Sequence, residues 1–396
     1  MKTPERFANL PVATWPRLRG LLDAVPPGGP VINMTIGDPQ HAFPSFVSEV
    51  LVAEMARFAQ YPDNNGEPAL LDSIGRWLHR RYGVTVSPDR TVTANGTREA
   101  LYNAAMALCP DDKDGQTPVV LTPNPFYQVY AVAALSVGAE PVYVNATAAT
   151  GHLPDFANLP GDVLDRTAIA YMCSPANPQG AVADESYWRT LLDLAEKHDF
   201  IIFADECYSE VYRESPPVGV LQVAESIGAN PDRVVAFHSL SKRSNLAGLR
   251  SGFCVSGAGN IARIRSLRAY AGSPIPGPVQ AASARVWDDE AHVTASRKLY
   301  AEKFALADQM LGHLPGYASP AGGFFLWLQV GDGERFAHRL WQETGVRVLP
   351  GSYLSRETPE GNPGQNYIRV ALVAPRDDVE RGLGHIRDQM TDEGNS

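Results

Sequence analysis

Between residues 90 and 240, short apolar runs alternate with stretches of helical periodicity, and this alternation is the feature that most limits the fold. Apolar runs occur at 92–94, 119–121, 169–172, 200–204 and 234–237. Helical periodicity follows several of them, at 100–108, 129–135 and 187–196. Strands that are apolar on both faces and alternate with helices predict an α/β fold with a mostly parallel sheet between helices. In such sheets the ligand binds beyond the carboxyl ends of the strands.

The pattern differs on either side of this region. Residues 1–44 are rich in proline and glycine and predict an extended arm. Residues 45–275 are predicted to form the large domain, with the first helix beginning near Ser45. After a Pro/Gly cluster, the pattern predicts one long helix, two strands and a further helix, at 279–312, 324–328, 367–373 and 334–343. Residues 276–396 are therefore expected to form a smaller α+β domain, which the arm joins.

Charge and composition exclude several classes of protein. A hydrophobic content of 44% is typical of a globular chain, and a net charge of -10 disfavours nucleic acid and anionic membranes as partners. No apolar run approaches the ~18 residues of a membrane span, and the N-terminus lacks the apolar core of a signal peptide. The cysteines are far apart, which predicts no metal site and no disulfides: Cys109, Cys173, Cys207 and Cys254. We therefore expect a cytoplasmic protein with reduced thiols.

One lysine has an unusual position in a chain that holds only six lysines. Lys242 follows the apolar run 234–237 through Ser239-Leu240-Ser241. A lysine at the ligand end of a buried strand can lose its proton and act as a nucleophile. Taken alone, the position favours a solvated lysine over a nucleophilic one.

Polar residues at the ends of other predicted strands change that interpretation. Asp205 ends a second apolar run and Tyr208 follows it, so a carboxylate and a phenol could contact a pyridine ring; a helix cap explains Asp205 equally well. Gly96-Thr97 lies between a strand and a helix, where free backbone N–H groups favour phosphate. Arg250 and Ser239 could add a charge and a hydroxyl to the same anion.

Together these motifs resemble a known family. Ser239-Leu240-Ser241-Lys242, with Arg250 eight residues later, is similar to the lysine motif of fold-type I (class I/II) aminotransferases, which use pyridoxal 5′-phosphate. The resemblance covers nearly the whole chain in order: Gly37-Asp38-Pro39, Tyr61-Pro62, Asn95-Gly96-Thr97, Pro125-Phe126-Tyr127, Ser174-Pro175-Ala176-Asn177-Pro178, Asp205-Glu206-Cys207-Tyr208 and Arg369. It implies the fold-type I transferase fold, in which a large domain with a mostly parallel mixed sheet between helices is joined to a smaller α+β domain.

The resemblance also implies roles around the cofactor ring. Lys242 would bind the cofactor covalently and carry the proton between the substrate α-carbon and cofactor C4′. Asp205 would keep the ring nitrogen protonated, so that the ring accepts electrons. Tyr208 and Asn177 would bind the ring hydroxyl oxygen, and Tyr127 would stack on the ring face.

Further roles concern the phosphate and the substrate. Four residues would hold the phosphate: Gly96, Thr97, Ser239 and Arg250. Tyr61 of the partner subunit would join them, which implies a homodimer with shared active sites. Arg369 would bind the substrate α-carboxylate as a two-pronged fork, beside the backbone of Gly37 and the Asn177 side chain. Closure of the small domain on the substrate is expected.

Within the family, four segments look most like bacterial N-succinyldiaminopimelate aminotransferases of lysine biosynthesis, which use glutamate as amino donor: 123–130, 205–211, 239–245 and 350–354. Residues 271–278 look less like that group. Binding of a second substrate carboxylate needs a cation besides Arg369, for which Arg243 and Arg19 are candidates.

Three alternatives stay open. They are another aminotransferase of the aspartate, aromatic or alanine type, a fold-type I lyase, and a regulatory protein with an aminotransferase-like domain. The last is disfavoured by the net charge of -10 and because only about 40 residues precede the first predicted helix, too few for a DNA-binding domain.

Overall fold

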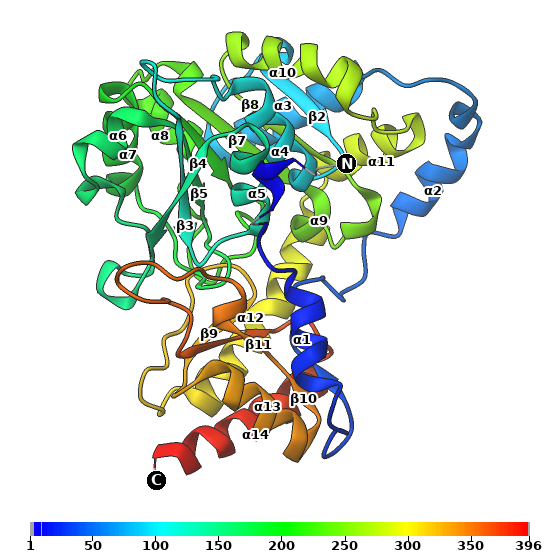
Figure 1. Ribbon diagram of the computed structural model, residues 1–396. Coiled ribbons are helices and arrows are strands. Elements are labelled where there is room, and N and C mark those ends of the chain that lie inside the picture. The colour runs from blue at the N-terminus through cyan, green and yellow to red at the C-terminus, as the bar shows by residue number, and fades with distance from the viewer. Residues whose placement is uncertain (1–3, 9, 395–396) are drawn as a thin grey trace.

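A seven-stranded sheet runs through the upper part of the molecule (Figure 1) in the computed structural model, which describes residues 4–8 and 10–394. The strand order is β2–β8–β7–β6–β5–β3–β4. Strand β8 is antiparallel to both of its neighbours, and all other pairs are parallel. The strands are β2 (Thr91–Ala94), β3 (Val119–Asn124), β4 (Glu140–Asn145), β5 (Thr167–Cys173), β6 (Ile201–Asp205), β7 (Val234–Ser239) and β8 (Gly252–Val255).

Helices cover both faces of this sheet, as the apolar strands require. Along β5, Ile169 and Tyr171 belong to one core and Ala170 and Met172 to the other, because successive side chains point to opposite faces. One core is covered by α4 (Thr97–Leu108), α5 (Gln128–Ser136) and α10 (Ala258–Ala271). The other is covered by α2 (Phe46–Ala53), α3 (Pro68–Tyr82), α7 (Glu185–Lys197), α8 (Val220–Ser226) and α11 (Gly277–Asp288).

The parallel strands bring four polar chain segments to one edge of the sheet. Strands β3, β5, β6 and β7 end there at Asn124, Cys173, Asp205 and Ser239, and Cys173 pairs with Asp205 in register. The short helix α9 (Leu240–Arg243) begins directly after β7. The loops after these strands are therefore close together in space although they are far apart in sequence.

The smaller domain lies below this edge (Figure 1). Its antiparallel sheet has the order β11–β12–β9, from Leu349–Pro350, Tyr367–Ala371 and Phe325–Gln329. The helices α12 (Ala291–Leu311), α13 (Gly333–Thr344) and α14 (Arg376–Gly394) belong to the same part of the chain. Its buried side chains form a separate core that includes Phe304, Phe336 and Ile386.

The N-terminal arm packs on this smaller domain. Strand β1 (Ile32–Asn33) pairs in parallel with β10 (Val346–Arg347). Helix α1 (Thr14–Leu22) packs against α13, where Leu18 and Leu22 share a small core with Trp341. The prediction of a wholly extended arm is therefore wrong. That prediction rested on the proline and glycine content, but Pro16 lies in the first turn of α1, where a proline removes no intrahelical hydrogen bond.

The predicted helix at 279–312 is two helices. Helix α11 ends at Asp288, and the Asp289 carboxylate accepts a hydrogen bond of 3.1 Å from the His292 N–H in the first turn of α12. Helix α11 packs on α2 and α3 with Trp287 in the large core, so the change from one core to the other occurs in α12, downstream of the predicted boundary at residue 276.

The remaining elements are short. They are α6 (Gly161–Arg166) and the 3-10 turns η1 (Glu5–Phe7), η2 (Met55–Ala59), η3 (Pro88–Arg90), η4 (Ala148–Thr150), η5 (Phe156–Asn158), η6 (Pro231–Arg233), η7 (Ala247–Leu249) and η8 (Gly351–Tyr353). Within the described ranges, no helix has the length and apolar character needed to cross a bilayer.

Candidate active site

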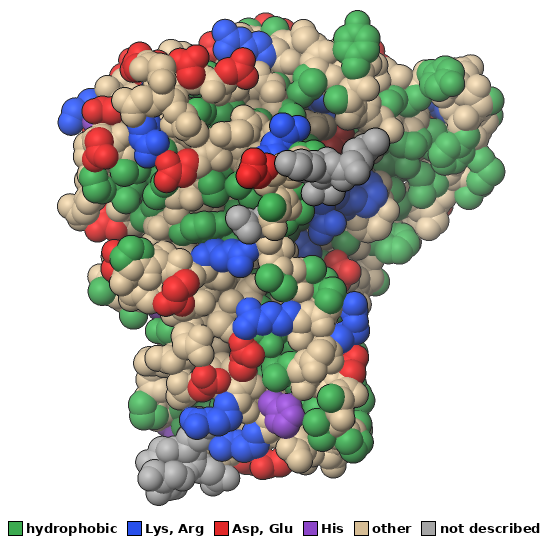
Figure 2. All heavy atoms as spheres, in the orientation of Figure 1, with side chains coloured by type: hydrophobic (Ala, Val, Ile, Leu, Met, Phe, Trp, Pro, Cys, Tyr) green, Lys and Arg blue, Asp and Glu red, His purple; other side chains and the backbone are tan. Residues whose placement is uncertain are grey.

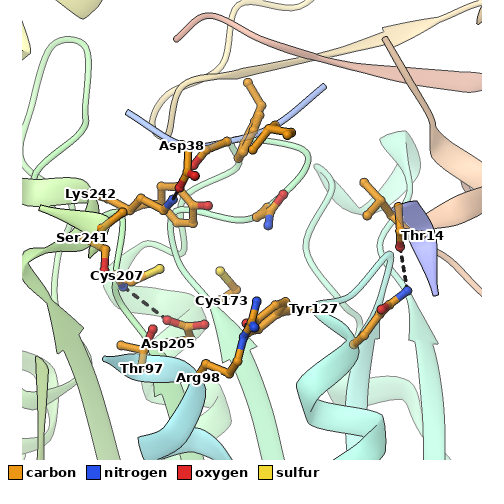
Figure 3. A pocket seen from close by; sticks show the side chains of 18 of the residues that line it. Thr14, Asp38, Thr97, Arg98, Tyr127, Cys173, Asp205, Cys207, Ser241 and Lys242 are labelled. Atoms are coloured by element: carbon orange, nitrogen blue, oxygen red, sulfur yellow. Dashed lines mark hydrogen bonds and ion pairs between the residues drawn. The ribbon is translucent and has the colours of Figure 1, made fainter. Parts of the chain in front are cut away.

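A cavity of about 710 Å³ lies at the carboxyl edge of the large sheet, between the two domains and the arm. Most of the residues predicted for the site line it: Gly37, Thr97, Tyr127, Asn177, Asp205, Tyr208, Lys242, Arg250 and Arg369. Figure 3 shows how Asp205, Cys207 and Lys242 point into this space from neighbouring strand ends. Gly96, Ser239 and Tyr61 do not line the cavity.

Lys242 projects from α9 toward the arm. Its Nζ donates a hydrogen bond to the Gly37 carbonyl oxygen and lies 3.9 Å from an Asp38 carboxylate oxygen (Figure 3). Burial lowers the pKa of the Lys242 amine, an effect that the nearby charge of Asp38 partly opposes. A lowered pKa increases the fraction of neutral amine, which is the nucleophilic form.

Asp205 ends β6 at the floor of the cavity and is 3% exposed. The Tyr130 hydroxyl donates a hydrogen bond of 2.7 Å to its Oδ2, and the Cys207 N–H donates one of 3.4 Å to Oδ1. Burial raises the pKa of Asp205, while these hydrogen bonds and the charge of Lys242 act in the opposite direction. The site therefore holds a buried carboxylate whose charged form is stabilised by donors on one side and faces an open cavity on the other.

Tyr130 was not among the predicted site residues. It lies on α5, three positions after Tyr127, and is 1% exposed. Tyr127 precedes α5 and Tyr130 lies in its first turn, so both follow the end of β3 closely, and this position after a predicted strand is the signal that could have found Tyr130.

The first turn of α4 and Arg250 form a cradle for an anion. Thr97 is the first residue of α4, and Gly96 before it has φ of 83°. A Cβ at Gly96 would lie 2.4 Å from Arg250 Nη2, so only glycine lets the guanidinium approach this turn. Arg250, itself at φ 56°, donates to the Ala247 and Asn95 carbonyl oxygens, each at 2.8 Å.

Ser239 and Ser241 differ in what their hydroxyls do. Ser239 caps α9, accepts a hydrogen bond from the Ser241 N–H and donates to the Ser251 carbonyl oxygen at 3.1 Å. Ser241, rather than Ser239, lines the cavity (Figure 3). Contact of Ser239 with a phosphate stays a prediction, and Ser241 is a candidate that the sequence analysis missed.

Tyr61 lies outside this cavity and is fully exposed, at 102% of the reference area. Its predicted role concerns the partner subunit's site and stays a prediction.

Arg369 comes from β12 in the smaller domain and is 5% exposed. Its Nη1 donates to Asn177 Oδ1 at 3.0 Å and its Nη2 to the Thr35 carbonyl oxygen at 2.6 Å, while its buried Nε has no hydrogen-bond partner. Burial lowers the pKa of Arg369 to about 10, which leaves the guanidinium charged at neutral pH. Gly37 completes this end, since a Cβ there would lie 2.5 Å from Phe325 Cζ.

Tyr208 and Tyr127 contribute phenol groups. Tyr208 is buried, with its ring against Phe324 and Phe325, and burial raises the pKa of its hydroxyl. The Tyr127 hydroxyl accepts a hydrogen bond of 2.7 Å from Arg98 Nε (Figure 3). Arg98 lines the cavity and was also missed by the sequence analysis.

The two arginines suggested for a second carboxylate lie elsewhere. Arg243 is 3% exposed and outside the cavity, where it pairs with Glu290 at 2.7 Å and donates to the Val286 carbonyl oxygen at 3.0 Å. Arg19 does not line the cavity either. Arg98 is therefore the better-placed cation.

The polar groups at this cavity suit one kind of ligand. The Asp205 carboxylate matches a protonated ring nitrogen, the cradle at Gly96 and Arg250 matches a phosphate ester, and the Lys242 amine matches an aldehyde.

Comparisons with known proteins indicate a family whose ligand has these three features. Residues 29–386 match the family model described as aminotransferase class I and II. The chain is similar to the LL-diaminopimelate aminotransferase of Dehalococcoides mccartyi strain 195, with 30% identity over 406 residues and 98% of each chain covered. It is also similar to solved aminotransferases from Neisseria meningitidis Z2491 (36% identity, TM-score 0.94, covering 98% of this chain and 100% of that one) and Helicobacter pylori 26695 (31% identity, TM-score 0.88, covering 100% of each).

Proposed function

Because the chain belongs to the class I and II aminotransferases, we propose that it transfers an amino group between glutamate and a keto acid that carries a second carboxylate. The first candidate substrate is N-succinyldiaminopimelate, in lysine biosynthesis. Members of this family use pyridoxal 5′-phosphate, which accepts the electrons and the amino group released by the substrate.

The residues of the cavity have separate tasks in this proposal. Lys242 Nζ takes the proton from the substrate α-carbon and delivers it to cofactor C4′. The Asp205 carboxylate holds a proton on the ring nitrogen, and Tyr208 with Asn177 binds the ring hydroxyl oxygen. Arg369 binds the substrate α-carboxylate, which orients the α-hydrogen toward Lys242.

The observation that carries the choice of substrate is a further guanidinium in the same cavity. Arg369 and Arg250 are assigned to the α-carboxylate and the phosphate, which leaves Arg98 as a third arginine among the lining residues. Among the described residues, the hydrogen bond that the structure shows for the Arg98 guanidinium is the one from Nε to the Tyr127 hydroxyl. We propose that its two terminal nitrogens bind a substrate anion.

A second candidate is LL-diaminopimelate itself, because the relative from Dehalococcoides mccartyi, similar over nearly the whole chain, bears that name. Both candidates carry a carboxylate at the far end of the substrate, and they differ in the amino group there, which is succinylated in one and a free ammonium in the other.

A panel of amino donors tests the proposal. The purified holoenzyme is assayed with 2-oxoglutarate and N-succinyl-LL-diaminopimelate, LL-diaminopimelate, aspartate, phenylalanine or alanine, and glutamate formation is measured. We expect the highest kcat/KM for one of the two diaminopimelate compounds. Release of many product molecules per active site without 2-oxoglutarate would instead indicate a lyase, because a transaminase can release only one before it needs the acceptor.

Substitution of Arg98 tests the basis of this choice. Arg98→Gln is expected to lower kcat/KM for the diaminopimelate donor about 30-fold, roughly the value of one charged hydrogen-bonded contact. Activity with alanine, which has no second carboxylate, is expected to change less than threefold. Equal losses with both donors would show that Arg98 acts on Tyr127 and not on substrate.

The proposed active form is a homodimer. Large apolar side chains are exposed on and after α2, at Val52, Met55, Phe58 and Tyr61, and Figure 2 shows hydrophobic atoms gathered on the lobe that Figure 1 labels α2. Burial of this surface against a second copy would bring Tyr61 of the partner subunit toward the phosphate. Mixing inactive Lys242→Ala protein with Tyr61→Phe protein should restore activity in heterodimers, and a fully active monomer in sedimentation would refute the shared site.

A further inference from the structure

A buried ion pair lies behind the anion cradle and outside the cavity. Glu99 is in the first turn of α4, two residues after Thr97, and Arg268 is on α10. Arg268 Nη1 donates to Glu99 Oε1, and the Arg268 side chain is only 2% exposed. In the part of the chain that the structure describes, Glu99 is the one carboxylate at ion-pair distance from Arg268.

The second oxygen of Glu99 fixes the turn that precedes α4. Its Oε2 accepts a hydrogen bond of 2.6 Å from the Asn95 N–H. The Asn95 carbonyl oxygen accepts from Arg250 Nη2 at 2.8 Å, and its side-chain Nδ2 donates to the Ser273 carbonyl oxygen at 2.6 Å. The N–H, the carbonyl oxygen and the side-chain Nδ2 of Asn95 are therefore all hydrogen-bonded, so Glu99 and Arg250 hold the same residue from its two sides.

The pair also reduces an electrostatic repulsion between Glu99 and an anion bound at the start of α4. A carboxylate in the first turn of a helix interacts favourably with the helix dipole, but it repels any anion bound at the same N-terminus. Arg268 neutralises Glu99 without lining the cavity itself. Gly272 packs directly on the pair, since a Cβ there would lie 2.8 Å from Glu99 Oε1 and 3.1 Å from Arg268 Nη1.

We propose that Glu99 and Arg268 are positioning residues for the cofactor phosphate. Glu99 orients the Asn95 peptide and through it Arg250, and Arg268 cancels the negative charge that Glu99 would otherwise present to the phosphate. This inference rests on the proposed function, in which the phosphate lies at Thr97 and Arg250.

The test compares two probes that differ only in the phosphate group. Apoenzyme is titrated with pyridoxal 5′-phosphate and with pyridoxal, and binding is followed by absorbance. Arg268→Met is expected to weaken pyridoxal 5′-phosphate binding about tenfold or more, because it leaves an unpaired carboxylate near the anion. Binding of pyridoxal should change less than twofold. The double variant Glu99→Gln with Arg268→Met removes the unpaired charge and should recover most of the lost affinity.

Arg263→Met is the matched control, because it removes the same charge from an exposed position on the same helix. It should bind both probes like the wild type. Equal weakening of both probes by Arg268→Met, or a double variant no better than the single one, would overturn the inference. If Arg268→Met does not fold, the double variant still decides, since loss of its preference for the phosphorylated probe would also overturn it.

The wild type separates this failure from failure of the proposed function. If wild-type apoenzyme binds pyridoxal as tightly as pyridoxal 5′-phosphate, the assignment of the phosphate to this cradle is wrong. If the wild type prefers the phosphorylated probe and Arg268→Met shows the same ratio of the two affinities, only the role of the ion pair is wrong.

Discussion

The two ends of the cavity are built in different ways. At the floor, the Asp205 carboxylate receives its hydrogen bonds from Tyr130 and Cys207, which belong to the same large domain. At the other end, Arg369 extends from the smaller domain and contacts Asn177 of the large domain and Thr35 of the arm. The first end is complete within one core, whereas the second exists only while three parts of the chain are in place.

This difference predicts different sensitivities. The floor should bind the cofactor regardless of how the smaller domain is placed, because neither Asp205 nor its two donors depends on it. Arg369 keeps a buried Nε without a partner, and an unpaired buried donor is costly unless a ligand satisfies it. Substrate binding should therefore be the step that depends on the arrangement of the domains.

The largest effect is expected from Lys242→Ala, because this side chain reaches from the large domain to Gly37 and so connects the two ends. Without the amine, no group in the cavity is positioned to take the α-proton, so turnover should fall below about one part in 10⁴. Borohydride reduction of the wild type followed by mass spectrometry should find the cofactor on the Lys242 peptide. Lys298→Ala, at an exposed position on α12, is the control and should behave like the wild type.

Asp205→Asn should have the next largest effect. It preserves shape but removes the charge that, in the proposed mechanism, keeps the ring nitrogen protonated, so kcat should fall about 10³-fold, or ~4 kcal/mol of barrier. The cofactor should still bind, because the phosphate cradle and Lys242 are unchanged. Asp205→Glu should retain more activity than Asp205→Asn. A wild-type rate in Asp205→Asn would mean that Asp205 is only a structural cap, and that this end of the cavity does not bind the cofactor ring as proposed.

Arg369→Lys tests the other end. A lysine keeps the charge but not the fork, so kcat/KM should fall about 100-fold, or ~2.7 kcal/mol, mainly through KM. Cofactor affinity should stay within twofold of the wild type. If cofactor affinity fell as much as substrate affinity, the two ends would not be independent.

The smallest effect is expected from Tyr130→Phe, which removes one hydrogen bond to Asp205. Burial already raises the pKa of Asp205 and the Tyr130 hydroxyl lowers it, so the substitution should raise that pKa further. The protonated carboxyl is the inactive form and is populated as the pH falls, so the acidic limb of the kcat/KM profile should move to higher pH. We expect a loss of about tenfold at acidic pH, becoming smaller as the pH rises. A loss of equal size at every pH would mean that Tyr130 acts by packing alone.

Much of the large domain could be predicted because its strands are short, apolar and followed by helices. Strand β8 and helix α14 were not predicted. The run Gly252–Val255 is short and follows a loop, and α14 carries many charged residues along 376–394, so neither shows the periodicity of a core element clearly. The break between α11 and α12 was missed because it lies within a continuous helical pattern, and the hydrogen bond from the His292 N–H to the Asp289 carboxylate at the break is local.

By itself, the sequence determined which chemical groups lie at the strand ends: Asp205 at the end of β6, Lys242 after β7 and Gly96-Thr97 at the start of α4. These follow from local periodicity, because a strand that is apolar on both faces must be buried and its polar successor must lie at the sheet edge. Only the tertiary structure decided the partners. It turned Ser241 toward the cavity in place of Ser239, enclosed Arg243 with Glu290, and brought Tyr130 to Asp205 and Arg98 to Tyr127. Side-chain hydrogen bonds and ion pairs join segments far apart in the chain, so their identity depends on how the helices pack on the sheet, and no local pattern in the sequence encodes that packing.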